Sequence, residues 1–138
     1  MNYSGSELNS KNVTDGTSNT YMLGEKHVDP LKYYDGHEWG DDWGMYTGQQ
    51  DDVSRMCYCK IQTIGGVDLE ESTAPIQDTP GTGNSYPESQ QFGSAHPSGM
   101  NMAFCDGSVH FISYEIDGYL HSILSNRHDG EVVNLNAL

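Results

Sequence analysis

The strongest constraint on the fold is an Asp-Gly pair, Asp106-Gly107, flanked by two short stretches of alternating apolar residues. Asp-Gly is typical of a two-residue hairpin turn, because a type I′ turn needs a positive φ at both central residues. Folding about this turn places Phe104 opposite Val109, and five apolar side chains then share one face: Met100, Met102, Phe104, Val109 and Phe111. A slip of one residue would scatter that face. The sequence therefore predicts an antiparallel hairpin over residues 100–114.

A helix is predicted directly after the hairpin, near residues 117–126. Four apolar residues recur there at helical spacing: Ile116, Leu120, Ile123 and Leu124. Asp117 is suited to the N-cap, and Gly130 to the point where the helix stops. Further strands are predicted at residues 21–28 and 57–64, the first with a short helix near Ser18 as the alternative, and a last short strand at 131–135. The fold class is therefore α+β, a small antiparallel sheet with long loops and a C-terminal helix.

The length of 138 residues fits a single domain over residues 1–138. Its hairpin and helix occupy residues 94–133, and residues 30–93 form a loop-rich insert. Within the insert we expect a short strand near residues 43–47. Residues 65–93 are rich in Gly, Pro, Ser, Thr and Gln and are predicted to be a long surface loop.

The chain is strongly acidic, with 20 acidic residues against 6 basic ones and a formal net charge of −14. Such a surface repels phosphate backbones and anionic lipids, which argues against nucleic-acid and membrane-surface partners. The sequence has no apolar run of about 18 residues that would span a bilayer.

Residues 33–52 are both acidic and aromatic. Their carboxylates are candidate ligands for calcium, which takes six to eight oxygens: Asp35, Glu38, Asp41, Asp42, Asp51 and Asp52. The alternative is a solvated acidic loop without a bound ion. Asp15 with Asn19 is a weaker candidate pair for a metal. The aromatic residues of the same stretch could stack on a glycan, cover a sheet or meet a neighbouring subunit: Tyr33, Tyr34, Trp39, Trp43 and Tyr46.

Three cysteines leave the redox state open. Cys57 and Cys59 are too close together for a usual zinc knuckle, and in a strand both would point to the same face. One of them could form a disulfide with Cys105 if the backbones approach. Three free, buried thiols are the alternative.

The sequence offers no convincing catalytic group. His96 and Asp106 are the obvious pair, but a strand at residues 100–105 would lie between them, and the two ends of such a strand are about 16 Å apart. We therefore expect His96 near the open end of the hairpin, beside Ser113 or Tyr114, and Asp106 in the turn. A general acid and base need hydrogen-bond reach, so we expect no enzymatic activity.

Residues 96–112 also resemble the H-X9-DG segment of the DUF1559 proteins, which are numerous in Planctomycetes and related bacteria. The segment Val13–Thr20 together with Gly24-Glu25 is similar to a second hallmark of that family. The resemblance covers roughly 60 residues at the two ends of the chain. The residues that carry it are Asp15, Gly16, Asn19, Glu25, His96, Gly99, Asn101, Asp106 and Gly107.

The resemblance implies a pseudopilin-like domain whose relatives begin with a prepilin-type hydrophobic helix, which is not found in this sequence. It implies export, a periplasmic or cell-surface location, and a non-enzymatic role in a filament or type II secretion apparatus. The expected partners are proteins, either copies of the chain or envelope components, with contact to the membrane only through such a helix. Related secretion pseudopilins hold calcium in a loop, so calcium is the one cofactor to expect, and the alternative function is an extracellular calcium- or glycan-binding module.

Overall fold

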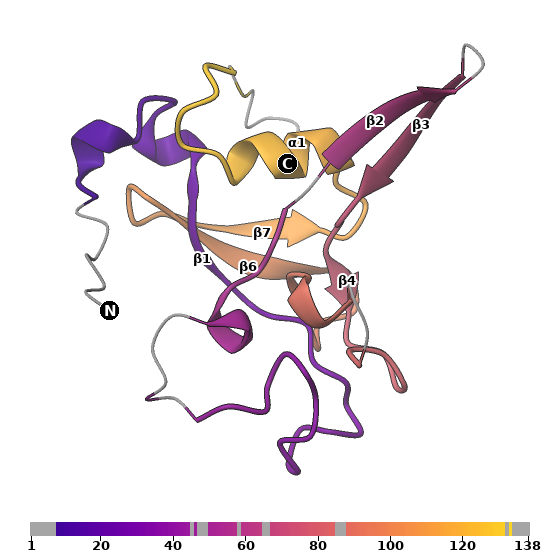
Figure 1. Cartoon of the computed structure of the whole chain (residues 1–138). Helices are drawn as coiled ribbons and strands as arrows, with labels where there is room; N and C mark the ends of the chain where they lie inside the picture. Colours follow the sequence, from indigo (N-terminus) through magenta and orange to yellow (C-terminus); the bar gives the residue numbers. More distant parts are fainter. Residues whose placement is uncertain are drawn as a thin grey trace, which may run out of the picture.

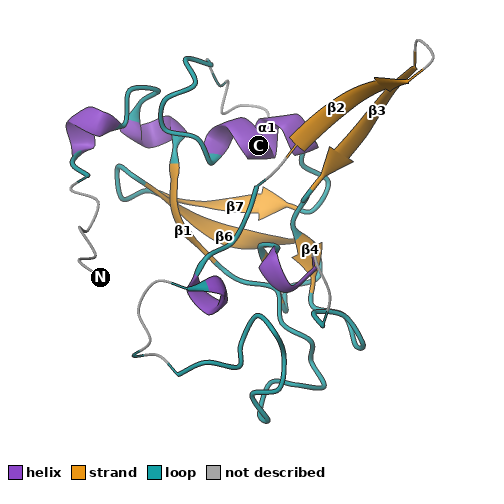
Figure 2. Cartoon of the chain, in the orientation of Figure 1, coloured by secondary structure: helices purple, strands orange, loops and turns teal. Residues whose placement is uncertain are grey.

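A three-stranded antiparallel sheet with strand order β1-β6-β7 carries the only α-helix of the described residues against one face (Figures 1 and 2). The computed structural model describes residues 8–44, 46, 50–57, 59–64, 67–84, 88–131 and 133. The strands of the sheet and the helix are β1 (Tyr21–Gly24), β6 (Gly99–Phe104), β7 (Val109–Ser113) and α1 (Gly118–Leu124). The other strands are β2 (Cys59–Ile64), β3 (Val67–Ser72), β4 (Ile76–Gln77) and β5 (Gly93–Ser94). The α+β expectation is confirmed.

Short 3-10 turns connect these elements: η1 (Ser10–Asn12), η2 (Thr17–Asn19), η3 (Asp51–Val53) and η4 (Glu88–Gln90). A helical turn was the alternative near Ser18, and η2 now occupies that position immediately before β1. Both alternatives at residues 17–28 are therefore partly right.

The hydrophobic core lies between the sheet and α1. Its fully buried side chains alternate along β6, with one more from β7 and one from the helix: Met100, Met102, Phe104, Ile112 and Leu124. Tyr21 of β1 packs edge-on against Phe104, with ring centroids 5.1 Å apart. Burying side chains of this size contributes about 1.5–3 kcal/mol each, so this small set holds the sheet and helix together.

The predicted hairpin is present, but its register is shifted by one residue. Met102 pairs with His110, and Met100 pairs with Ile112. The turn is a three-residue loop in which the Gly107 N–H donates to the Phe104 carbonyl at 2.9 Å. Gly107 has a φ of +87°, whereas no described non-glycine residue has a positive φ. A loop that ends in a left-handed glycine replaces the expected type I′ turn, because Asp106 then keeps an ordinary backbone.

Because the register is shifted by one residue, each side chain of β7 points to the opposite face from the one predicted. Ile112 is buried under α1, whereas Val109 and Phe111, which were predicted to share the face of Met100, are more than half exposed. The prediction was therefore right for β6 and wrong for β7, since successive side chains of a strand point to opposite faces.

Helix α1 begins as predicted. The Asp117 carboxylate accepts a hydrogen bond from the Leu120 N–H at 2.9 Å, which satisfies one of the free donors of the first turn. The helix ends at Leu124, so Gly130 is not its stop. Gly130 instead has a φ of +79° in the loop that follows.

β2 and β3 form an arm that extends away from the sheet (Figure 1). β2 confirms the strand predicted at 57–64, but β3 overturns the prediction of a loop from residue 65 onward. Ile64 pairs with Val67 at the end of this register. The sequence between them is Gly-Gly, which is a typical hairpin pair.

Two other strands were predicted, near residues 43–47 and at residues 131–135. Trp43 lies in a bend, Tyr46 in a turn, and Gly44 has no regular structure, so the described residues of the first segment form no strand. Most of the second segment lies outside the described residues; Glu131 and Val133, which are described, are not in a strand. In the described residues, no helix has both the length and the apolar character to cross a bilayer.

Candidate functional site

The residues of the H-X9-DG motif lie at the two ends of the β6–β7 hairpin. At the open end, Glu25 follows β1 and reaches across to β6. Its Oε2 accepts hydrogen bonds from the Asn101 N–H at 2.6 Å and from the Asn101 Nδ2 at 3.2 Å. Its Oε1 lies 3.6 Å from the His96 Nε2. Glu25, His96 and Asn101, hereafter the motif cluster, therefore join β1, β6 and the loop before β6.

The loop that carries His96 is fixed by Tyr114. The Tyr114 hydroxyl lies 3.0 Å from the Ser94 carbonyl oxygen and 3.1 Å from that of His96. The expectation that His96 lies beside Tyr114 is confirmed. Gly99 begins β6 next to this loop, and a Cβ there would overlap the carbonyl oxygen of Ile112 and the ring of Phe111, so the position requires glycine.

Asp106 lies at the opposite end, in the turn. Its Oδ1 accepts hydrogen bonds from the Ser108 hydroxyl at 2.7 Å and from the Ser108 N–H at 2.9 Å, and these bonds hold the pKa of the exposed carboxyl below its usual range. His96 and Asp106 thus have separate partners at separate ends of the hairpin. The structure does not bring them together as a catalytic pair.

The N-terminal motif segment binds the same turn. The Asp106 N–H donates to the Thr17 carbonyl at 3.0 Å, and the Cys105 N–H donates to the Thr20 carbonyl at 2.9 Å. Gly16 has a φ of +100°, a conformation that favours glycine, and this allows η2 to begin. The N-terminal motif segment and the turn between β6 and β7 therefore form one hydrogen-bonded unit.

Asp15 connects that unit to the C-terminal loop. Its two carboxylate oxygens accept hydrogen bonds from the Asp129 N–H at 2.8 Å and the Gly130 N–H at 3.0 Å. Asn19 Nδ2 donates to the Asp15 carbonyl at 3.1 Å. The side chains of Asp15 and Asn19 thus both bind backbone groups of the chain itself.

A second polar group lies inside the core, and no motif in the sequence predicts it. The Cys57 thiol is 3.2 Å from His121 Nε2, and the Tyr21 hydroxyl is 3.3 Å from His121 Nδ1. Cys57 and His121 are 64 residues apart, so no local spacing connects them. Only the position of His121 on the buried face of the helix could have indicated that its side chain points inward.

These three residues, hereafter the core trio, are neutral near pH 7. Burial raises the pKa of Cys57 to about 12 and lowers that of His121 to about 4. Burial also raises the pKa of Tyr21. A nucleophilic cysteine works as a thiolate, so the core trio has the composition of a Cys–His dyad but not its charge state.

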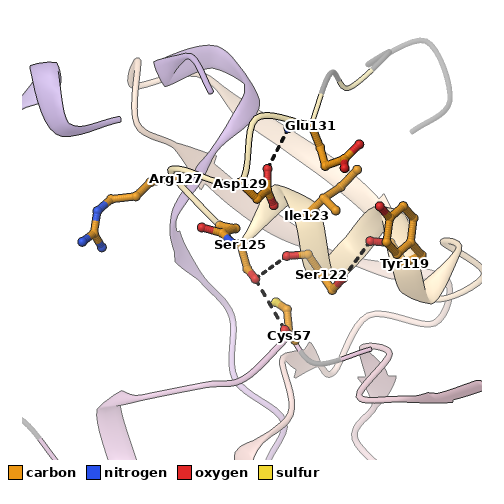
Figure 3. Close-up of a pocket in the computed structure, with 9 residues that line it drawn as sticks. Cys57, Tyr119, Ser122, Ile123, Ser125, Arg127, Asp129 and Glu131 are labelled. Carbon is orange, nitrogen blue, oxygen red and sulfur yellow. Dashed lines mark hydrogen bonds between the residues drawn. The ribbon is translucent and has the colours of Figure 1, made fainter. Parts of the chain in front are cut away.

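Cys57 also lines a surface cavity of about 480 Å³ at the C-terminal end of α1 (Figure 3). The Ser125 hydroxyl donates to the Ser122 carbonyl at 2.6 Å, and the Cys57 carbonyl oxygen lies 3.5 Å from the same hydroxyl. Asp129 accepts from the Glu131 N–H at 2.9 Å, and Arg127 points away from the other labelled side chains. The Ser125 hydroxyl and the Asp129 carboxylate in this cavity therefore bind neighbouring backbone groups.

The disulfide expected as one alternative is not formed. Cys57 and Cys105 are free thiols, and the Cys105 thiol faces the Tyr21 carbonyl oxygen at 3.5 Å. The side chain of Cys59 lies outside the described residues. Burial raises the pKa of Cys105 as well, with the neighbouring Asp106 charge as the second cause.

Four of the six candidate calcium ligands each have a different partner. Glu38 is fully buried and its Oε2 accepts from the Asp29 N–H at 2.5 Å, while Asp52 Oδ2 accepts from the Trp43 N–H at 2.6 Å. Asp41 forms an ion pair with Lys26. Asp35 is 3.7 Å from Lys32 Nζ.

Asp42 is exposed, and the side chain of Asp51 falls outside the described residues. Within the described part of the chain, no three His, Cys, Asp or Glu side chains gather in a way that could hold a metal.

Residues 30–46, apart from residue 45, form an irregular loop that we call the aromatic loop. It lies far from α1 in Figure 1. All five of its aromatic side chains are exposed: Tyr33 by 41%, Tyr34 by 100%, Trp39 by 61%, Trp43 by 63% and Tyr46 by 94%. They therefore do not cover the sheet, which was one of the alternatives.

A family model described as "Protein of unknown function (DUF1559)" matches residues 1–118. Neither a curated protein nor a solved structure matches the chain. The match includes the N-terminal motif segment, the aromatic loop, the β2–β3 arm and the complete hairpin, so it also covers the middle stretch that the resemblance left out.

Proposed function

The chain belongs to the DUF1559 family, and from this premise we propose that it is a non-enzymatic, exported, pseudopilin-like domain that acts by binding other proteins of the cell envelope. In this proposal it is a subunit of a filament or of a type II secretion apparatus. It lies in the periplasm or at the cell surface, and its partners are proteins rather than nucleic acids.

The observation that carries the proposal is the use of the motif residues inside the fold. Glu25 binds Asn101, Asp15 binds the loop at 129–130, and Asp106 binds Ser108. These polar atoms are directed at the chain itself, which is the pattern of residues that maintain a shape. A motif with that role supports a structural function.

The charge state of the core trio supports the same conclusion. Catalytic groups need pKa values matched to proton transfer near the working pH. The burial of Cys57 and His121 moves both pKa values away from neutrality. The trio therefore contributes to packing and hydrogen bonding in the core.

The proposal is tested in the native organism with the full gene product. We expect a chromosomally tagged protein to fractionate with the envelope, and a photocrosslinking amino acid at Tyr34 to give discrete protein adducts there. A crosslinker at Glu115, which is exposed near α1, serves as the control site. Recovery in the cytoplasmic fraction, without adducts from Tyr34, would overturn the proposal.

A second candidate is an extracellular module that binds calcium or a glycan. The exposure of Trp39 and Trp43 favours a glycan, because flat aromatic faces stack on sugar rings. Titration of the protein with envelope-derived oligosaccharides, monitored by calorimetry, tests it. Saturable heat that is lost in Trp39→Ala would support the glycan, and its absence at millimolar sugar would remove this candidate.

A further inference from the structure

We propose that the aromatic loop is the partner-binding surface of this domain and that it takes a lysine- or arginine-rich segment of another protein. This inference rests on the proposed function, since it names the partner chemistry of an interaction domain. Three properties of the loop support this partner: its exposure, its rigidity and its charge.

The aromatic side chains of the loop are exposed to solvent. Trp39 and Trp43 are the two tryptophans of the chain, and both are more than 60% exposed on the same loop. Tryptophan is highly buried on average, because its large apolar surface is costly to leave in water. Tyr34 and Tyr46, nearly fully exposed, lie in the same segment. Aromatic residues are also the class enriched where proteins bind one another.

The backbone of the loop is also held in place. The aromatic loop has no regular secondary structure, yet buried side chains hold its backbone at several points. Glu38 accepts from the Asp29 N–H, and Asp52 accepts from the Trp43 N–H at the base of the exposed indole. Lys26 donates to the Gly40 carbonyl at 3.0 Å and pairs with Asp41. A surface fixed in this way loses little conformational entropy on binding.

The negative charge of the loop and its surroundings selects the partner. Between residues 29 and 52 the sequence has seven acidic residues and one lysine, Lys32. Asp35 and Asp42 are exposed among the aromatic side chains. An ammonium or guanidinium group is attracted both to carboxylates and to the face of an aromatic ring. The net charge of −14 would steer such a segment toward the domain, whereas a neutral sugar gains nothing from it.

The two tryptophans make the test direct, because intrinsic tryptophan fluorescence reports on the aromatic loop alone. We would titrate the folded domain with a lysine-rich peptide of about 12 residues, with an arginine-rich peptide, and with a glutamate-rich peptide of equal length. We expect saturable fluorescence changes with the two basic peptides and none with the acidic one. Affinity should fall as salt is raised, since the contact is partly electrostatic.

Substitutions separate specific binding from general attraction to an acidic protein. Trp39→Leu and Trp43→Leu should each weaken binding about tenfold, as expected for loss of a cation–π contact. Asp35→Asn with Asp42→Asn should weaken it severalfold and reduce its salt dependence. The matched controls are Tyr119→Leu and Glu115→Gln, an exposed aromatic residue and an exposed acid outside the loop, which should leave affinity unchanged.

Three outcomes would overturn the inference. The fluorescence could stay constant at millimolar basic peptide, or both tryptophan variants could bind as well as the wild type. A neutral oligosaccharide could also bind the loop while the basic peptides do not. If crosslinking from Tyr34 captures an envelope protein while the basic peptides fail, the partner chemistry is wrong and the interaction role stands. Cytoplasmic recovery of the protein would reject that role itself.

Discussion

The sheet with its helix and the aromatic loop are stabilised by different interactions. β1, β6, β7 and α1 enclose six buried apolar side chains, and register decides which residues point inward. The aromatic loop exposes its apolar side chains, and its base is held by the buried carboxylates of Glu38 and Asp52, which accept hydrogen bonds from backbone N–H groups. The first arrangement is typical of a folding core, and the second of a surface held in place for contact.

Truncation of one aromatic residue from each region should give very different costs. Phe104→Ala removes a fully buried ring and should lower the free energy of unfolding by about 3–5 kcal/mol. Tyr34→Ala removes a fully exposed ring and should change it by less than about 0.5 kcal/mol. Urea denaturation measures both. Similar losses in the two variants would show that the loop is part of the core.

Acid should weaken the core through His121. Its folded-state pKa of about 4 is below the ordinary value of 6.5, so the unfolded chain binds the proton more tightly. The contribution is complete above pH 6.5 and is lost as the pH falls toward 4, amounting to about 3 kcal/mol. Denaturation between pH 7 and 4 should show this slope in the wild type, and His121→Gln should lack it. An unchanged slope in the variant would mean that other groups cause the acid sensitivity.

The base of the aromatic loop should respond to pH in the opposite sense. Burial raises the folded-state pKa of Glu38, so its charge is a cost at pH 7. Glu38→Gln keeps an acceptor for the Asp29 N–H and removes the charge, and should raise stability at pH 7 by about 1 kcal/mol. The gain should shrink as the pH falls below the folded-state pKa, where wild-type Glu38 is also neutral. Glu115→Gln, at an exposed site, is the control and should have no such profile.

The smallest effect is expected from calcium. Among the candidate calcium ligands between residues 35 and 52, the described side chains bind backbone N–H groups or lysines, except for Asp42, which is exposed. Millimolar calcium should therefore leave Tm where millimolar magnesium leaves it. A rise in Tm specific to calcium and absent from Asp42→Asn would show a site that includes groups beyond those described.

The sequence predicted what depends on local pattern. β6, α1 and its Asp117 cap follow from alternation, helical spacing and capping chemistry. The hairpin turn was located correctly, but its register was not, since Asp-Gly fits a two-residue and a three-residue loop alike. β3 was missed because the Gly, Pro and Ser content of residues 65–93 hid a Gly-Gly hairpin signal.

The candidate sites were harder to predict because they depend on contacts between distant segments. The core trio joins Tyr21, Cys57 and His121, which no spacing rule connects. The buried Glu38 and Asp52 have the same residue types as a solvated acidic loop, and only the surrounding backbone distinguishes the two cases. The exposure of the five aromatic residues was likewise one of several alternatives in the sequence.

The bonds between Asp15 and residues 129–130 have a mechanical consequence. The Thr14 N–H also donates to the Arg127 carbonyl at 2.8 Å, so the chain enters and leaves the described fold at adjacent points. Tension applied across these two points is carried first by this short set of hydrogen bonds, before it reaches the sheet. If the chain were pulled from both ends, a low force would extend the segments before Thr14 and after Gly130, while the hairpin and α1 stay folded. The same adjacency makes the domain easy to insert into a surface loop of a carrier protein without distorting either partner.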